Sequence, residues 1–328
     1  MPLNPFLLLL SSFLIVYFVT KWRYRPCGKK TLPPSPPKVP ILGNLHQLSA
    51  LTHRSLQSLG RKYGPVLLLH FGNKPVFIVQ SAGVAMEIMK TNDLMFADKP
   101  TSRTTDKLFF DSKCHAPRPG LDVNTGDDIV AGGTDTASAT LEWAMTELLR
   151  HPAVLKKLQN EVREVLEGKR DITDSDLEKM HYLKAVIKET LRYHVPVPFM
   201  ARVARDNLKV SGYDIASGTL VIINAWAIGR DPASWSEPEN FEPERFLNTP
   251  VDFRGQDFGL IPFGSGRRGC PGITFAMASV ELVLANLMQK FNWDLPDGRK
   301  GEELDVMEHP GVTIHRKNPL FAIATDHC

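Results

Sequence analysis

The chain is short of cysteine, and the few cysteines it has are too far apart for a disulfide framework or a zinc site. They are Cys27, Cys114, Cys270 and Cys328, with no CxxC pair among them. Disulfide-stabilised secreted domains carry many closely spaced cysteines, and structural zinc sites need paired ligands. The wide separation of the four cysteines excludes a disulfide-stabilised domain and a structural zinc site, and it is typical of proteins from a reducing compartment.

An excess of one charge is also missing. The 39 Lys and Arg residues nearly balance the 36 Asp and Glu residues, which leaves a formal net charge of +3. There is no basic stripe with interleaved aromatic residues, so the sequence does not indicate a nucleic-acid partner. The histidines show no metal-ligand spacing, and His194 is expected to be a surface or core residue. The apolar fraction of 43% is that of a globular protein.

A long uncharged apolar segment opens the chain. Residues 2–20 contain no charged side chain, and basic residues follow, beginning with Lys21 and Arg23. A helix of this length nearly spans the hydrocarbon core of a bilayer. A cleaved signal peptide, the alternative, would carry its positive charge before the apolar run. Because positive flanks stay on the cytoplasmic side, we expect residues 1–20 to be a membrane anchor that leaves the rest of the chain in the cytosol.

Three segments are expected between the anchor and the main body. Residues 21–40 form a basic, proline-rich hinge, in which the prolines favour a stiff, extended backbone. Residues 41–112 form an N-terminal β-rich part, and residues 113–127 are an irregular, proline-rich junction. Periodicity predicts a helix, a hairpin that turns at Gly72-Asn73, and a short helix in the β-rich part, at residues 53–63, 66–79 and 82–91.

Residues 128–328 form a mainly helical core with small β-sheets. Apolar residues at helical spacing predict helices at 129–150, 153–166, 174–180, 182–193 and 273–291. Thr173 or Asp174 is expected to cap the third of these helices. Alternation predicts strands within residues 210–223, and again at 311–314 and 320–323.

The most informative segment is residues 263–272, which read FGSGRRGCPG. Cys270 follows Arg267 and Arg268, and nearby cations favour the thiolate, the form of cysteine that binds metal. Pro271 suits the first turn of a helix, so Cys270 is expected at a helix N-terminus, where unpaired N–H groups also favour a negative sulfur. The alternative is a buried structural cysteine in a glycine-rich turn.

This segment resembles the haem-ligating loop of cytochrome P450 monooxygenases, whose pattern is Phe-x-x-Gly-x-Arg-x-Cys-x-Gly. The matching residues, which the resemblance makes candidates for haem binding, are Phe263, Gly266, Arg268, Cys270 and Gly272. Residues 40–45 and 224–232 are similar to plant microsomal (A-type) members. The resemblance implies a P450-like helical fold and haem b, with iron bound axially by Cys270. It also implies dioxygen and NADPH-derived electrons as co-substrates, an NADPH-cytochrome reductase as partner, a small lipophilic substrate and an endoplasmic reticulum membrane location.

Gly132 and Gly133 interrupt the long predicted helix. Each glycine costs about 1 kcal/mol relative to alanine in a helix, so a helix that keeps both needs a groove or a local distortion there. The resemblance places this segment over the distal face of the haem, where Thr136 helps to hold dioxygen and water and Asp135 helps to deliver protons. The alternative is a loop at the two glycines, with Asp135 capping a helix that starts at Thr136.

The resemblance also makes five charged residues candidates for supporting or binding the haem. Glu189 and Arg192, three apart on one helix face, and Arg245 in a Pro-Glu-Arg-Phe segment are implied to form a buried ion network that supports the haem-binding core. Arg268 is a candidate partner of a haem propionate, because a guanidinium matches a carboxylate bidentately. Arg202 is a second, weaker candidate.

The resemblance breaks between residues 112 and 128, where the family carries a large group of helices. Without those helices the substrate loses most of its roof, and neighbouring helices expose apolar faces that favour aggregation or a partner. The sequence therefore predicts a membrane-anchored haem-thiolate monooxygenase that inserts one atom of dioxygen into a small lipophilic substrate. The alternatives are a truncated, catalytically inactive haem-binding membrane protein and a membrane-tethered helical interaction protein without haem.

Overall fold

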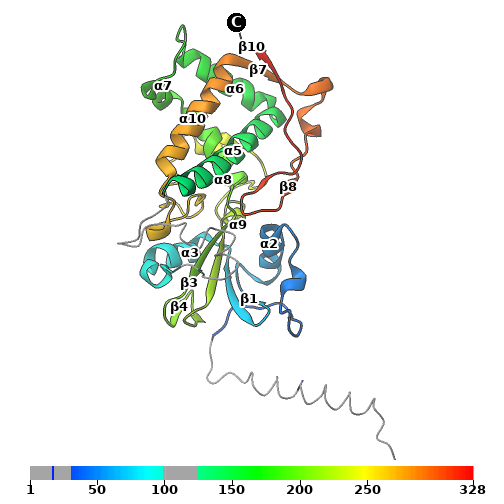
Figure 1. The fold of residues 1–328 in the computed structure, drawn as a ribbon, viewed down its shortest axis with the longest axis vertical. Coiled ribbons are helices and arrows are strands. Elements are labelled where there is room, and N and C mark those ends of the chain that lie inside the picture. Colours follow the sequence, from blue (N-terminus) through cyan, green and yellow to red (C-terminus); the bar gives the residue numbers. More distant parts are fainter. Residues whose placement is uncertain (1–16, 18–30, 99, 101–124, 328) are drawn as a thin grey trace, which may run out of the picture.

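The computed structural model describes residue 17, residues 31–98, residue 100 and residues 125–327. The predicted anchor, apart from Tyr17, lies outside these residues, as do much of the hinge and most of the junction. In the part of the chain that is described, no helix is both long and apolar enough to cross a membrane. Figure 1 shows a lower part built on a sheet and an upper part built of helices.

The main sheet has the strand order β1-β2-β6-β3. β1 (Val66–Phe71) and β2 (Lys74–Val79) form the predicted antiparallel hairpin, with Gly72 in the turn at a φ of 62°. β6 (Leu220–Asn224) runs parallel to β2, and β3 (Phe199–Val203) pairs antiparallel with β6. The sheet therefore takes half of its strands from outside residues 41–112, the segment expected to hold the β-rich part.

Short helices and a small hairpin surround this sheet. α2 (Thr52–Tyr63) confirms the helix predicted at 53–63. The helix predicted at 82–91 is α3 (Ala82–Met86), which continues as the π-helical turn η2 (Glu87–Thr91). The alternation predicted within 210–223 corresponds in part to the hairpin of β4 (Leu208–Val210) and β5 (Tyr213–Ile215). The 3₁₀ turns of the described chain are η1 (Leu45–Gln47), η3 (Asp93–Phe96), η4 (Pro243–Phe246), η5 (Gly266–Arg268), η6 (Pro296–Gly298) and η7 (Gly301–Glu303).

The upper part consists of helices whose ends follow the sequence signals. They are α5 (Thr125–Arg150), α6 (Pro152–Val165), α7 (Asp174–Lys179), α8 (His181–Tyr193) and α10 (Ile273–Lys290). The short helix α9 (Ala225–Ile228) follows β6 and packs with the sheet part, against α2 and β3. Pro152 is the first residue of α6, and Thr173 caps α7 in a capping box with Asp176. α5 begins at Thr125, so the irregular junction predicted at 113–127 ends earlier than expected.

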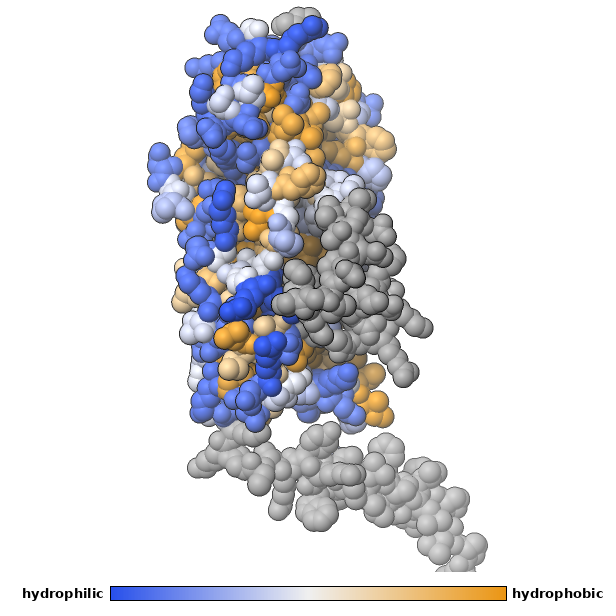
Figure 2. Space-filling model, turned by 60° about the vertical axis from the view of Figure 1, so that its left-hand side comes forward, coloured by the Kyte–Doolittle hydropathy of each residue, from blue (hydrophilic) through white to orange (hydrophobic). Residues whose placement is uncertain are grey.

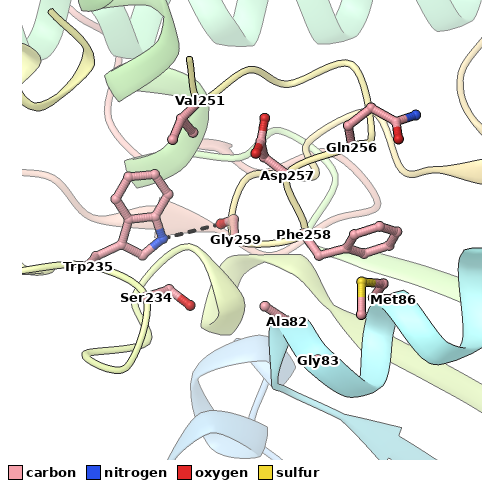
Figure 3. Close-up of a pocket in the computed structure, with 10 residues that line it drawn as sticks. All are labelled: Ala82, Gly83, Met86, Ser234, Trp235, Val251, Gln256, Asp257, Phe258 and Gly259. Atoms are coloured by element: carbon pink, nitrogen blue, oxygen red, sulfur yellow. Dashed lines mark hydrogen bonds between the residues drawn. The ribbon is translucent and has the colours of Figure 1, made fainter. Parts of the chain in front are cut away.

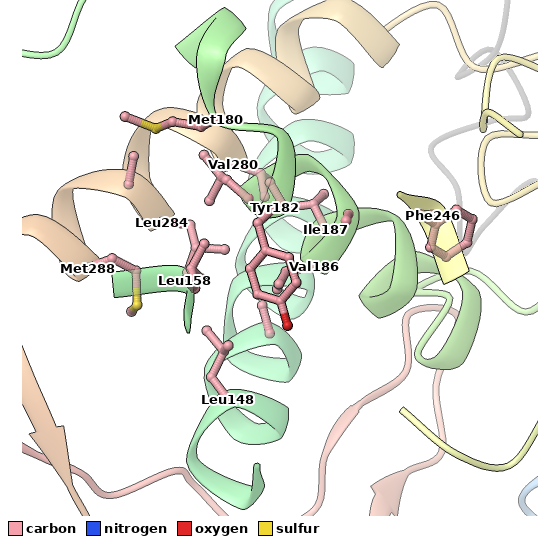
Figure 4. Packing of buried hydrophobic residues seen from close by; sticks show 14 of the residues in the cluster. Leu148, Leu158, Met180, Tyr182, Val186, Ile187, Phe246, Val280, Leu284 and Met288 are labelled. Atoms are coloured by element: carbon pink, nitrogen blue, oxygen red, sulfur yellow. The ribbon is translucent and has the colours of Figure 1, made fainter. Parts of the chain in front are cut away.

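The apolar faces of α5, α6, α8 and α10 form the largest core cluster. Figure 4 shows side chains of this cluster from these helices, and Phe246 of η4 belongs to the same cluster. Leu148, Leu158, Val186 and Leu284 are fully buried there. The opposite side of α10 is different, because Phe275, Leu282 and Val283 are exposed. On the face drawn in Figure 2, apolar side chains lie interspersed with polar ones.

The C-terminal strands differ from the prediction. They are β7 (Phe291–Asp294), β8 (Glu308–His309), β9 (His315–Arg316) and β10 (Ile323–Asp326), paired as β7 with β10 and β8 with β9. The strand predicted at 311–314 is wrong, because this segment is the turn between β8 and β9. Ile314 is buried, which accounts for the apolar pattern, but its N–H donates to Pro196 O and its carbonyl accepts from Trp143 Nε1. The strand predicted at 320–323 overlaps β10 only at Ile323.

Candidate functional site

The cysteine loop is closed by its own backbone. The N–H of Cys270 donates to Phe263 O at 2.8 Å, and that of Gly269 donates to Gly266 O at 2.9 Å. Cys270 is a free, exposed cysteine, so the alternative of a buried structural cysteine is wrong. α10 begins at Ile273 with Gly272 as its N-cap, so Pro271 lies before the helix. The prediction that Pro271 lies in the first turn of this helix is therefore wrong. The sulfur of Cys270 therefore lies just before the N-terminus of α10.

Gly266 allows this loop to lie against the neighbouring turns η2 and η3. Its φ is +69°, and a Cβ at this position would overlap the carbonyl oxygen of Met89 and lie 2.8 Å from Asp93 Oδ1. Asp93 holds the next residue, because its carboxylate accepts from the N–H of Arg267 at 3.2 Å and pairs with Arg267 Nε at 3.1 Å. Only glycine can therefore occupy position 266 without moving backbone atoms.

Two arginines lie side by side near the loop without a carboxylate partner in the described chain. Arg268 donates from Nε to Ala97 O at 2.6 Å. Arg202, on β3, is 7% exposed and donates from Nη2 to Arg268 O at 3.4 Å. Burial, together with the charge of Arg268, lowers the pKa of Arg202 to about 10. A buried guanidinium without an acid is costly, so this pair suits an anionic group such as a haem propionate.

α5 runs without a break through Gly132 and Gly133, so the alternative of a loop capped by Asp135 is wrong. The nearest atom to a Cβ on Gly133 would be Phe275 Cε1 at 3.9 Å, and a Cβ on Gly132 would meet nothing within 4 Å. The described packing does not itself require glycine at either position, which leaves room for a ligand to approach the helix. The contact with Phe275 also brings this part of α5 beside the start of α10, which follows Cys270.

Asp135 and Thr136 have different partners. Thr136 Oγ1 donates to Gly132 O at 2.7 Å, a bond within the helix backbone. The side chain of Asp135 is 54% exposed, and its Oδ1 lies 3.0 Å from Nε2 of His315 on β9. Sequence reasoning did not single out His315, because no local pattern connects it to α5.

The structure brings Glu189, Arg192 and Arg245 together. Arg192 donates from Nε and Nη2 to the two oxygens of Glu189, at 2.6 and 2.7 Å, and Arg245 donates from Nε to Glu189 Oε1 at 3.1 Å. Glu189 and Arg192 are almost completely buried. Arg192 also donates to the carbonyl oxygens of Gly229, Pro238 and Asn240. The group therefore joins α8 to the chain that leads into η4.

His194 is a core residue, one of the two possibilities expected from the sequence. It is 5% exposed, its ring stacks on Trp143 with centroids 3.9 Å apart, and Nε2 lies 2.7 Å from Glu147 Oε1. An open hollow in the described part of the chain lies elsewhere. It has a volume of about 400 Å³ and lies between α3 and residues 251–259, where Trp235 Nε1 donates to Gly259 O (Figure 3). Neither Cys270 nor Asp135 lines it, so we do not assign it a role in the chemistry.

Residues 33–116 and 123–322 match the model of the family described as Cytochrome P450. The chain belongs to the cytochrome P450 family. Membership makes it an oxidoreductase of the monooxygenase class, and haem with cysteine-thiolate ligation is the rule for such enzymes. The exposed thiol of Cys270 suits that ligation, because a porphyrin supplies the nitrogen ligands of the iron and the protein adds a sulfur ligand.

Several relatives show the same membership. The chain is 37% identical to Cytochrome P450 71A8 of Mentha piperita over 477 aligned positions, which cover 96% of this P450 and 95% of the relative. It is 33% identical to psoralen synthase of Ammi majus, with 99% of each chain covered. A solved zebra fish cytochrome P450 with abiraterone superimposes with a TM-score of 0.74 at 20% identity, covering 85% of this chain and all of that one. The P450 fold is therefore shown.

Proposed function

We propose that this P450 binds haem b through Cys270 and inserts one atom of dioxygen into a small lipophilic substrate, with electrons that reach it from NADPH through a reductase. The observation that carries the proposal is the exposed sulfur of Cys270 in a backbone-closed loop just before α10. The buried Arg202 beside Arg268, neither paired with an acid among the described residues, supports it. When bound, the haem supplies the activation of dioxygen.

The residues of the chain have separate tasks in this mechanism. Cys270 would bind the iron as thiolate, and Gly264 and Gly266, both at positive φ, let the loop pack closely against Met89 and so fix the place of Cys270. Arg202 and Arg268 hold the propionates. Thr136 supplies a hydroxyl beside the open glycine segment of α5. Asp135 carries a proton on its carboxylate from the solvent side toward the distal pocket.

A carbon monoxide spectrum of the reduced, purified protein tests the ligand. We expect a strongly red-shifted Soret band, because thiolate ligation produces it, and we expect Cys270→Ser to abolish that band. Cys328→Ser is the matched control and should keep it. A red-shifted band that survives in Cys270→Ser would show that another group ligates the iron.

Membrane attachment is proposed for residues 1–20, with residues 21–40 as the hinge and the endoplasmic reticulum as the location. Support comes from the uncharged run at 2–20 and the basic residues after it. Alkaline carbonate extraction of microsomes should leave the full chain in the membrane fraction and release a chain that lacks residues 1–20. Extraction of the full chain would contradict the anchor.

A second candidate function is a haem-binding protein without turnover. It is favoured by the alignment to Cytochrome P450 71A8, whose 477 positions exceed the 328 residues of this chain, and by the two separate segments of the family match. The relative thus carries a long stretch without a counterpart here. Haem binding with no NADPH consumption in the presence of reductase would support this candidate, and NADPH-dependent product would eliminate it.

A further inference from the structure

His315 contacts the acid to which the proposed function assigns proton delivery. Its Nε2 lies 3.0 Å from Asp135 Oδ1, although the two residues are 180 positions apart in the sequence. The side chain of His315 is 33% exposed and that of Asp135 is 54% exposed. The contact therefore lies at the boundary between solvent and α5.

The residues on both sides of His315 are anchored to α5 and its neighbours, Ile314 by its backbone and Arg316 by its side chain. On the N-terminal side, Ile314 accepts a hydrogen bond from Trp143 Nε1 at 2.9 Å and donates one to Pro196 O at 2.8 Å. On the C-terminal side, Arg316 donates from Nη1 to Asp305 O at 2.7 Å and to Thr146 Oγ1 at 3.3 Å. The imidazole is thus presented to α5 by a short strand that has little freedom to move.

Asp135 has no comparable support from its own helix. The hydroxyl of its neighbour Thr136 is occupied by Gly132 O, and Ser138 Oγ donates only to the backbone carbonyl of Asp135. Among the described residues, His315 is the one side chain that bonds to the carboxylate of Asp135. An exposed aspartate on a helix samples several rotamers, and holding one of them costs side-chain entropy. Without His315 the carboxylate would spend only part of its time in the orientation that proton delivery needs.

We propose that His315 is the positioning residue of Asp135 and the route by which a proton reaches it from solvent. The proposal rests on the proposed function, in which Asp135 serves proton delivery. Nδ1 of His315 makes no hydrogen bond to any described residue and is open to water. As one proton enters the ring at Nδ1, one leaves from Nε2 to the carboxylate, so the ring ends with the same number of protons.

The contact itself is tested by carbethoxylation of the haem-loaded full chain, followed by mass spectrometry of the peptide that contains His315. We expect Asp135→Ala to raise the labelling rate of His315 severalfold, because Nε2 is freed. His309, exposed on the paired strand β8, is the internal control, and its rate should not change. Equal labelling of His315 in the wild type and in Asp135→Ala would overturn the proposal.

The role is tested with reductase and NADPH by measuring hydrogen peroxide released per NADPH consumed, with 7-ethoxycoumarin as a lipophilic probe. We expect His315→Leu to release severalfold more peroxide, His315→Gln to recover part of the loss because its amide still donates, and His309→Leu to match the wild type. Turnover driven by cumene hydroperoxide should survive in His315→Leu, because this oxidant does not need the NADPH-coupled protonation. A merely structural tie would lower both kinds of turnover together.

The two possible failures can be told apart. A His315→Leu variant that keeps the red-shifted carbon monoxide band and releases no more peroxide than the wild type would overturn the role of His315 alone. A wild-type chain that shows the band but consumes no NADPH with reductase would defeat the proposed function, and the role of His315 with it.

Discussion

Single residues decide whether the cysteine loop can adopt its conformation. Gly266 has a positive φ, and it also lies against the backbone of η2 and the carboxylate of Asp93. Gly298, in η6, shares the positive φ, but a Cβ added there would have no atom within 4 Å. Comparing a substitution at Gly266 with the same substitution at Gly298 separates the free-energy cost of a left-handed backbone from that of steric overlap.

We predict that Gly266→Ala destabilises the protein and prevents haem retention at Cys270, because the new methyl group would overlap Met89 O. Gly298→Ala should cost only the conformational energy of a left-handed residue, about 1–2 kcal/mol. Denaturant unfolding and the carbon monoxide band measure both effects. Equal behaviour of the two variants would show that the loop has room at position 266.

At the scale of elements, α8 is held to the segment before the cysteine loop by charge as well as by apolar contacts. Glu189 accepts from Arg192 and Arg245 and also from the N–H of Glu242, at 2.7 Å. Glu189 and Arg192 are buried and the side chain of Arg245 is 9% exposed, unlike the ordinary exposed pair of the same spacing. The network therefore holds η4 against α8, whereas an exposed pair on a helix surface would contribute little to the packing of these elements.

We predict that Glu189→Gln lowers the free energy of unfolding by about 3–5 kcal/mol, because two buried guanidinium groups lose their charged partner. Asp297→Asn is the control, because it removes an exposed pair with Arg299, worth at most about 1 kcal/mol. Urea unfolding of both variants measures the difference. A loss in Glu189→Gln no larger than in the control would contradict a buried network.

At the scale of the whole molecule, a buried carboxylate ties the C-terminal segment to the sheet part. Glu308 of β8 lies 2.9 Å from His53 Nε2 and 2.6 Å from Arg54 Nε, both on α2. Burial by itself raises the pKa of Glu308, but the hydrogen bonds from His53 and Arg54 outweigh it and lower the pKa to about 2. Regions that are far apart in the sequence are thereby joined.

Because the pKa of Glu308 is lowered, the stabilisation that its contacts with His53 and Arg54 give to the folded protein depends on pH. The unfolded chain binds the proton of Glu308 near pH 4.3 and the folded chain only near pH 2, so the stabilisation is complete above about pH 5 and is lost as the pH falls toward 2. We predict that Glu308→Gln is less stable at pH 7 and loses less stability on acidification than the wild type. Urea midpoints at pH 7 and 3.5 test this, with the exposed Glu303→Gln as control.

Elements with strong local signals were predicted well from the sequence. The helix at 53–63, the hairpin at Gly72 and the Thr173 cap depend on periodicity, turn chemistry and capping, which act over a few residues. The strand predicted at 311–314 failed because the burial of Ile314 comes from contacts with Trp143 and Pro196 rather than from strand pairing. Alternation alone cannot distinguish these two causes of burial.

The sequence by itself supplied the candidate for the iron ligand, because the pattern of Gly266, Arg268 and Cys270 that resembles the haem loop of the family lies within one loop and is a local property of the chain. For the charged groups outside the predicted network of Glu189, Arg192 and Arg245, only the tertiary structure decided which of them meet. The pairing of Asp135 with His315 and of Glu308 with His53 depends on how β8 and β9 lie against α5 and α2. No spacing in the sequence encodes contacts between residues so far apart, because packing of whole elements brings them together.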